Sequence, residues 1–188
     1  MNGQPIERDL AAAVGRPVRF ANDANCLALS EATDGAGAGH RVVFAVILGT
    51  GNGAGIAVDG RVLTGPNGLA GEFGHVPLPW ADATDPQFAC YCGQQGCNET
   101  LLSGTGIARD HQHVTGQQIT TGEIAQRANA GDPACMATLE RHAVRLAKAL
   151  AGVINLLDPE VIVLGGGVSL MPHLYQRVPA LWSRWVFS

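Results

Sequence analysis

The chain contains 188 residues with a mass of 19.5 kDa, a length typical of a single domain that can have two lobes. Hydrophobic residues make up 46% and charged residues 15%, which is enough apolar material for a core and excludes an intrinsically disordered chain. The formal net charge is −4 and Lys and Arg form no cluster, which argues against a dedicated nucleic-acid-binding protein.

No segment of the sequence predicts insertion into a membrane. The longest purely apolar run, from Val42 to Leu48, has seven residues, whereas a spanning helix needs about 20. The first residues, Met1 to Pro5, lack the charged segment and apolar stretch of a secretory signal. We therefore expect a cytoplasmic protein that associates with neither a membrane nor a nucleic acid.

The first predicted elements are a strand and a helix that meet at a polar pair. Val18–Phe20 is a short candidate strand that leads directly into Asn22 and Asp23. A helical stretch follows, with Cys26 among its expected core residues, and Asp34-Gly35 ends it. The polar pair has two interpretations of equal weight: a helix cap, or a loop that carries a catalytic carboxylate.

A strand buried on both faces is predicted next. Arg41–Leu48 is rich in β-branched residues and almost continuously apolar. It runs into a glycine-rich segment, Gly49–Gly55, which is either a loop whose backbone N–H groups cradle phosphate or a simple turn. Asp59-Gly60 lies between Ile56–Val58 and Arg61–Leu63, so this sequence predicts a β-hairpin.

Residues 64–99 form a long segment rich in Gly, Pro and Cys without helical periodicity, which indicates a functional site or a metal clip. Helix starts are predicted at Thr121 and at Asp132-Pro133. The second of these helices has apolar residues spaced alternately by three and four positions, and Asp158-Pro159 ends it. This stripe comprises Leu139, Ala143, Leu146, Leu150, Val153 and Leu157.

A second buried strand, Glu160–Leu164, follows this helix and ends in Gly165–Gly167. A helix followed by a strand that ends in glycines is an α/β element. Its ligand site is expected at the carboxyl end of the strand. The three glycines either face a nucleotide or form a tight turn from strand to helix. The sequence shows no internal repeat.

Three cysteines within eight residues, Cys90, Cys92 and Cys97, give the sharpest local signal. Their thiols and the intervening glycines suit a tetrahedral structural zinc site that needs one more ligand, for which His75 is the nearest candidate. Disulfides are the poorer interpretation in a chain without a secretory signal, and three reduced cysteines without a metal remain the alternative. Cys135 is expected to be a small core residue.

Together, these motifs resemble the ROK family of sugar kinases and related repressors, and within it the bacterial fructokinase (mannokinase) branch. The resemblance extends over nearly the whole chain, and the cysteine motif is highly specific. It implies an α/β protein with the actin-like, ribonuclease-H-like ATPase fold. The motifs that carry it are Asn22-Asp23, Leu48-Gly49-Thr50-Gly51, Gly68-x-x-Gly71-Glu72-x-Gly74-His75, Cys90-x-Cys92-Gly93-x-x-Gly96-Cys97-x-Glu99 and Leu164-Gly165-Gly166-Gly167.

The resemblance implies a role for each matching residue. Asp23 matches the base that activates the sugar hydroxyl for attack on the γ-phosphate of ATP, which binds with Mg²⁺. His75 would bind zinc through one ring nitrogen and face the sugar with the other, and Cys90, Cys92 and Cys97 would complete the zinc site. The expected sugar-binding residues are Asn22, Asn67, Gly68, Glu72, His75 and Glu99. The expected nucleotide-binding residues are Thr50, Gly51, Gly165, Gly166 and Gly167.

The sequence departs from the family pattern in two places. No Asp-x-Gly-Gly-Thr phosphate loop precedes Asn22, and the chain stops at Ser188, before the family's C-terminal helix. We therefore expect an incomplete N-terminal lobe, of which residues 1–33 are the remnant with the catalytic Asp. Residues 34–188 would be most of the C-terminal lobe, with the zinc-binding segment at 72–99. Phosphoryl transfer depends on positioning and charge neutralisation, so such a chain should have little activity.

The leading functional hypothesis is an ATP-dependent hexose kinase that phosphorylates the 6-hydroxyl of fructose. A second is the sugar-sensing effector domain of a ROK repressor, although no basic recognition helix is present in the sequence. A third is a product that only binds sugar or dimerises. The resemblance also implies a homodimer, without indicating which residues form its interface.

Overall fold

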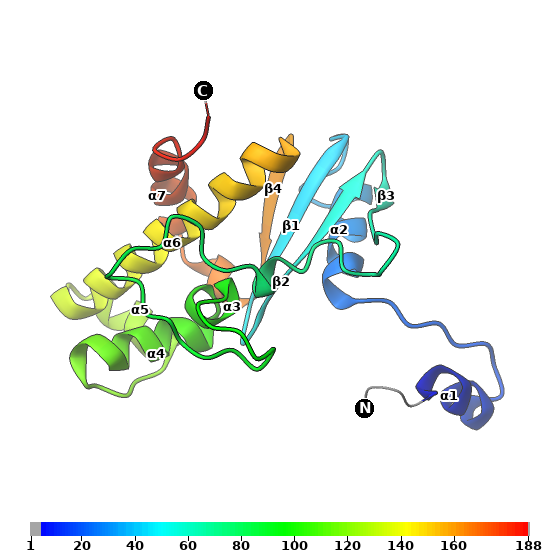
Figure 1. Ribbon diagram of the computed structural model, residues 1–188, viewed down its shortest axis with the longest axis horizontal. Helices are drawn as coiled ribbons and strands as arrows, with labels where there is room; N and C mark the ends of the chain where they lie inside the picture. Colours follow the sequence, from blue (N-terminus) through cyan, green and yellow to red (C-terminus); the bar gives the residue numbers. More distant parts are fainter. Residues whose placement is uncertain (1–4, 188) are drawn as a thin grey trace.

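A computed structural model describes residues 5–187 (Figure 1). The sheet contains four strands: β1 (Val42–Leu48), β2 (Asn52–Val58), β3 (Arg61–Val62) and β4 (Val161–Gly165). The helices are α1 (Ile6–Val14), α2 (Asp23–Thr33), α3 (Asn98–Leu102), α4 (Gly104–Thr115), α5 (Thr121–Asn129), α6 (Pro133–Leu157) and α7 (His173–Trp182). Two short 3₁₀ helices cover Phe73–His75 and Gly167–Leu170. Within residues 5–187, no helix combines the length and the apolar character needed to cross a bilayer.

The strands are ordered β3-β2-β1-β4, which confirms the predicted α/β arrangement. β1 pairs antiparallel with β2 and parallel with β4, where Ala45 lies opposite Val163. Asp59 and Gly60 connect β2 to β3 with positive φ values of 49° and 72°. This backbone matches the twist of a tight hairpin, so the predicted hairpin is also confirmed.

Side chains of β1 alternate between two cores, as the two-residue period of a strand requires. Val43 and Ala45 pack with Ala28 of α2 on one face. Phe44, Val46 and Leu48 belong to the larger core on the other face, which α3 to α7 complete. Figure 1 shows α2 behind the sheet and the long α6 across its opposite side. The strand is therefore buried on both faces, as its apolar sequence predicts.

The long helix α6 begins and ends where the sequence indicates. The Asp132 carboxylate accepts hydrogen bonds from the backbone N–H groups of Ala134 and Cys135, and Pro133 occupies the first turn. Asp158 ends the helix in the left-handed conformation. The predicted apolar stripe faces the core: Leu139, Ala143, Leu146 and Leu150 are buried, and Val153 and Leu157 pack at its margin.

Three local predictions are wrong. Val18–Phe20 is not a strand, because no neighbouring strand pairs with it in the described part of the chain; it lies in the extended connection from α1 to α2. Cys26 is exposed rather than buried, because Ala24 and Ala28 define the packed face of α2 and Cys26 lies on the other side. The glycine-rich loop is shorter than expected, since β2 already begins at Asn52.

α2 lies so close to β2 that one strand position accepts only glycine. A Cβ added at Gly55 would overlap the carbonyl group of Ala24 and approach Ala28 Cβ to 2.8 Å. We expect Gly55→Ala to reduce the free energy of unfolding by about 2 kcal/mol, because α2 must shift away from the sheet. Gly122→Ala is the control: apart from the adjacent residues and the backbone of its own helix, no atom of residues 5–187 lies within 4 Å of its added Cβ, so its effect should be neutral or stabilising. Equal urea midpoints for Gly55→Ala and the wild type would contradict this account.

A fully buried histidine, His142 of α6, links that helix to the end of α3. Its Nε2 lies 3.0 Å from the backbone carbonyl oxygen of Leu102, which can only accept a hydrogen bond, so Nε2 carries the proton. Burial disfavours the charged imidazolium and outweighs this hydrogen bond, lowering the pKa of His142 to about 4.

The lowered pKa of His142 predicts a loss of stability in acid. The unfolded chain takes up the proton near pH 6.5 and the folded chain does not until about pH 4. Stability is therefore complete above pH 6.5 and decreases by up to about 3 kcal/mol as the pH falls through this window. Urea unfolding at pH 7 and pH 4.5 measures the loss, which His142→Asn should at least halve. His113→Asn, which removes an exposed imidazole, should leave the loss unchanged.

Candidate active site

Asp23 is the first residue of α2 and lines a cavity of about 470 Å³. The preceding Asn22 caps the helix, because its Oδ1 accepts the N–H of Asn25 at 3.0 Å. Asp23 Oδ1 accepts the N–H of the adjacent Ala24 at 2.9 Å, and the residue stays exposed. The cap and the candidate base are thus two adjacent residues, and both interpretations of this pair are compatible.

Four of the expected sugar-binding residues line the same cavity: Asn22, Glu72, His75 and Glu99. Glu99 lies on α3, and its Oε2 accepts the backbone N–H of Asn52 at 3.2 Å. This bond connects α3 to the first residue of β2. The cavity therefore gathers carboxylates and an imidazole from segments far apart in the sequence, a set that can accept and donate hydrogen bonds to several hydroxyl groups.

Close backbone contacts fix Glu72 and His75. A Cβ at Gly71 would lie 2.5 Å from the carbonyl oxygen of Ala54, and one at Gly74 would overlap the carbonyl of Asn52. The two glycines thus allow this segment to lie directly against β2. Sequence reasoning recognised the glycines as part of a motif but not this packing role.

His75 and the three cysteines of the motif form one cluster, in which all four potential ligand atoms lie within 4.8 Å of one another. Cys90 Sγ lies 3.6 Å from His75 Nδ1, and Cys92 Sγ lies 3.7 Å from Cys97 Sγ. The sulfur–sulfur distance is too long for a disulfide and close to the ~3.8 Å edge of a tetrahedron with metal–sulfur bonds of about 2.3 Å. The donor set and its spacing therefore fit a tetrahedral metal ion.

The thiols of the cluster differ in acidity without a metal. Burial raises the pKa of Cys97 to about 12, while a hydrogen bond from the Gln94 backbone lowers the pKa of Cys92. A bound cation would favour the thiolate form at each sulfur, including the buried Cys97.

Two residues that sequence reasoning missed also line the cavity, Tyr91 and Asn52. The Tyr91 hydroxyl lies 2.9 Å from His75 Nε2, the ring nitrogen expected to face the sugar. The Asn52 side chain is buried, and within residues 5–187 neither its oxygen nor its nitrogen has a hydrogen-bond partner. Tyr91 stands between two cysteines of the motif, which was a usable signal, whereas Asn52 is hidden in a run of glycines.

A second cavity of about 680 Å³ adjoins the first, and Gly49 and Thr50 line both. The start of α4 forms another wall, because the N–H of Gly104 donates to the Gly49 carbonyl oxygen at 2.7 Å and Thr105 Oγ1 donates to that of Thr50 at 2.8 Å. Gly167 also lines this second cavity. The two cavities thus meet at the turn between β1 and β2.

The remaining predicted residues do not line the cavity for which each was expected. Gly51 lines the first cavity rather than the second. Gly165 and Gly166 line neither: Gly166 packs against the end of β1, where a Cβ would lie 2.6 Å from the Leu48 carbonyl oxygen. Asn67 and Gly68 lie in an exposed turn. Of the expected ligand contacts, these five are the ones that the structure does not bring to the cavity for which they were expected.

Comparison with known proteins adds independent information. Over 183 residues the chain is 41% identical to an N-acetyl-D-glucosamine kinase of Yersinia enterocolitica, covering 94% of this chain and 60% of that protein. It is 42% identical over 188 residues to an N-acetyl-D-glucosamine kinase of Shigella boydii, covering 95% and 62%. The chain thus spans about 60% of the length of these relatives.

Solved structures give a similar result. A ROK hexokinase from Thermus thermophilus has a TM-score of 0.85 at 35% identity, covering 98% of this chain and 63% of that one. A ROK family glucokinase from Streptomyces griseus, in complex with glucose and AMPPNP, has a TM-score of 0.84 at 31% identity, covering 98% and 64%. A ROK family transcriptional regulator, a homologue of the E. coli MLC protein, has a TM-score of 0.81 at 30% identity, covering 97% and 48%.

The sequence matches the ROK family over residues 1–188, and the structural neighbours confirm the expected actin-like ATPase fold. The two cavities, the carboxylates of the first one and the cysteine cluster beside it agree with this assignment. The chain therefore belongs to the ROK family.

Proposed function

We propose that this chain carries the hexose site and part of the nucleotide site of an ATP-dependent sugar kinase. The observation that carries the proposal is the convergence of Asp23, Glu72, His75 and Glu99 on one cavity. A polyol is selected by pairing a buried polar group with each hydroxyl, and these four side chains supply both donors and acceptors. The Streptomyces griseus relative, solved with glucose and AMPPNP, supports a hexose and a nucleotide as the two ligands.

In this proposal Asp23 is the general base. Its carboxylate is exposed and lines the first cavity, called the hexose cavity from here on, so it can accept the proton of a sugar hydroxyl. Such a base contributes roughly 10²–10⁴ in rate. The nucleotide occupies the second cavity, so its phosphates extend toward the shared turn at Gly49 and Thr50. Mg²⁺ enters with ATP and neutralises phosphate charge. The chain's own residues position the acceptor oxygen against the terminal phosphate.

The comparisons change the order in which acceptors should be tested. Sequence analysis favours fructose, whereas the curated relatives named above are N-acetyl-D-glucosamine kinases. We therefore propose N-acetyl-D-glucosamine as the first acceptor and fructose as the second. Glucose and mannose complete the panel, since all four present hydroxyl groups to the same set of side chains.

A ROK-type sugar sensor is the alternative function, because the transcriptional regulator has a TM-score of 0.81 with this chain. A sensor needs the hexose site but not a catalytic base. The exposed Asp23 carboxylate beside the hexose cavity favours the kinase. Turnover of any hexose by the wild-type chain would decide between the two functions.

We predict that Asp23→Asn retains hexose affinity within about twofold and reduces any ADP release by at least about 100-fold, because the amide cannot accept the hydroxyl proton. Calorimetry with each hexose and ADP release from ATP with Mg²⁺ provide the two measurements. Asp34→Asn removes the same charge from the other end of α2 and should change neither. Turnover of any hexose would rule out a pure sensor, and no hexose binding at all would refute both functions.

We further propose that the cluster of His75, Cys90, Cys92 and Cys97 binds one structural zinc ion. Four protein ligands leave no open position for catalysis, so the metal would act by holding the segment between Glu72 and Glu99 in place. Its thiolate ligands require deprotonation, so affinity should fall as the pH decreases.

Metal analysis of the purified chain should find about one zinc per molecule, and Cys92→Ser should lower both the zinc content and the melting temperature. The matched control is Cys26→Ser, which changes an exposed cysteine outside the cluster. Its zinc content should equal that of the wild type. Purified wild-type protein that contains no zinc and takes none up would refute the proposal.

A further inference from the structure

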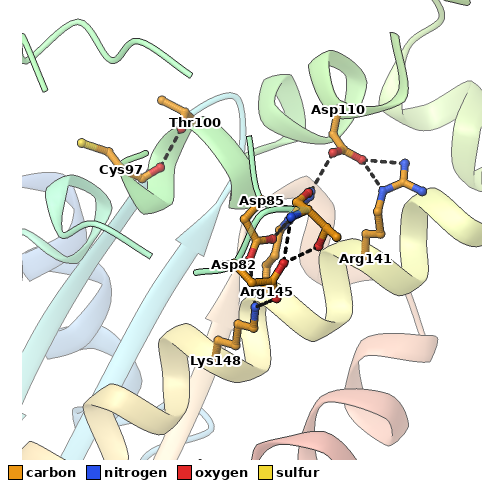
Figure 2. Close-up of polar contacts among 9 residues, drawn as sticks. Asp82, Asp85, Cys97, Thr100, Asp110, Arg141, Arg145 and Lys148 are labelled. Atoms are coloured by element: carbon orange, nitrogen blue, oxygen red, sulfur yellow. Dashed lines mark hydrogen bonds and ion pairs between the residues drawn. The ribbon is translucent and has the colours of Figure 1, made fainter. Parts of the chain in front are cut away.

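Six charged side chains join three parts of the structure in a mostly buried network (Figure 2). Three cations lie on one side of α6 and meet acidic groups of α4 and of the irregular segment that carries the cysteines. The cations are Arg141, Arg145 and Lys148, and the acids are Asp82, Asp85 and Asp110. Neither the proposed catalytic residues nor the proposed zinc ligands belong to this network.

Arg145 occupies its centre and contacts both neighbouring parts. Its Nε donates to Asp85 Oδ1 at 2.7 Å, and its Nη1 donates to Asp110 Oδ1 at 2.8 Å. A third bond runs from Nη2 to the Thr84 carbonyl oxygen at 3.2 Å. All three charged side chains are at most 4% exposed, so the planar guanidinium forms a buried bridge between residues 84–85 and α4.

The two outer cations each contact one part alone. Lys148 Nζ lies 2.8 Å from Asp85 Oδ2 and 3.1 Å from Asp82 Oδ2, both in the irregular segment. Arg141 donates to Asp110 Oδ2 of α4, from Nε at 2.9 Å and from Nη2 at 2.7 Å. In the described chain, Arg145 is thus the one cation of the network that bonds to both parts.

The irregular segment and helix α4, which Arg145 joins, each contribute to the wall of one cavity. The segment bonded through Asp85 continues to Cys90 and to Tyr91, which lines the hexose cavity. Helix α4, bonded through Asp110, begins at Gly104 and Thr105, which line the second cavity. If the irregular segment or α4 moved relative to α6, the wall of one cavity would move with it. If both moved, the distance between the proposed hexose and nucleotide would change.

We propose that Arg145 is a positioning residue that fixes the hexose-site wall and the nucleotide-site wall relative to each other. The inference rests on the proposed function for the identity of the ligands, but not for the bridge itself. Buried ion pairs add little net stability compared with apolar packing, whereas removing one partner is strongly disruptive. The bridge is therefore better explained by the geometry that it imposes than by the stability that it adds.

Three substitutions that each remove one positive charge test this role: Arg145→Met, Arg141→Met and Lys148→Met. In every variant Asp85 and Asp110 each keep at least one cation as a partner. The variants therefore differ in whether α6 loses an ion pair to the irregular segment, to α4, or to both. Hydrogen exchange by mass spectrometry on the whole chain then reports the opening of residues 82–97 and of 104–115 separately. This measurement needs no ligand.

Arg145→Met should increase exchange at least about tenfold in both segments. Lys148→Met should do so in residues 82–97 alone and Arg141→Met in residues 104–115 alone. Calorimetry with N-acetyl-D-glucosamine and with AMPPNP and Mg²⁺ provides the functional readout. Binding of one ligand should alter the affinity of the other, and this coupling should be lost in Arg145→Met but retained in the two outer variants.

An Arg145→Met chain that opens in only one segment would overturn the proposal, as would an outer variant that opens both segments. Equal coupling in Arg145→Met and wild type would overturn it too. If the wild type binds neither ligand, the proposed function fails, and the exchange pattern still decides the positioning role. A variant that unfolds globally is replaced by Arg145→Lys, whose single ammonium group cannot reach both acids at once; it must open at least one of the two segments more than the wild type does.

Discussion

The cavity requires a long segment without regular secondary structure to keep one shape. Residues 63–97 contain one short 3₁₀ helix, yet Glu72, His75 and Tyr91 must converge on the cavity that Asp23 also lines. Backbone hydrogen bonds within a helix or sheet cannot supply this rigidity, so it comes from contacts with other parts of the molecule. Fixing each residue of such a segment costs about 1–2 kcal/mol of conformational entropy, which these contacts must offset.

Four different interactions hold the segment, each at a different place. The glycines at 71 and 74 let the backbone lie against β2, where any side chain would collide with a carbonyl group. The cysteine cluster gathers residues 75–97 around one point, and Arg109 of α4 packs over the Phe88 ring at 4.0 Å. The charged network attaches residues 82–85 to α6. The site is therefore anchored on the rigid scaffold of β2, α4 and α6, as accurate positioning of binding groups requires.

Sequence periodicity was sufficient to predict β1, the hairpin, α6 and β4, because their residues follow the local rules of strands, turns and helix caps. It failed at Val18–Phe20, where a strand depends on a pairing partner, and at Cys26, where the packed face of the helix depends on the approaching sheet. Asp23 and Glu99, which the motifs predict to lie at one site, line the same cavity. The motifs could not reveal Arg145, since its partners are 35 and 60 residues away and its role appears only in the folded chain.

The charged network also explains why polar groups, rather than leucines, connect these parts. Apolar side chains of similar volume would be at least as stabilising, but they would allow residues 82–85 to slide along α6 with little change in energy. Only very few arrangements of three acids and three cations pair every buried charge. A one-position shift would separate Asp85 from both Arg145 and Lys148, and an unpaired buried charge is severely penalised. Charge pairing therefore selects one register of the segment, and through it the places of the side chains that surround the proposed hexose.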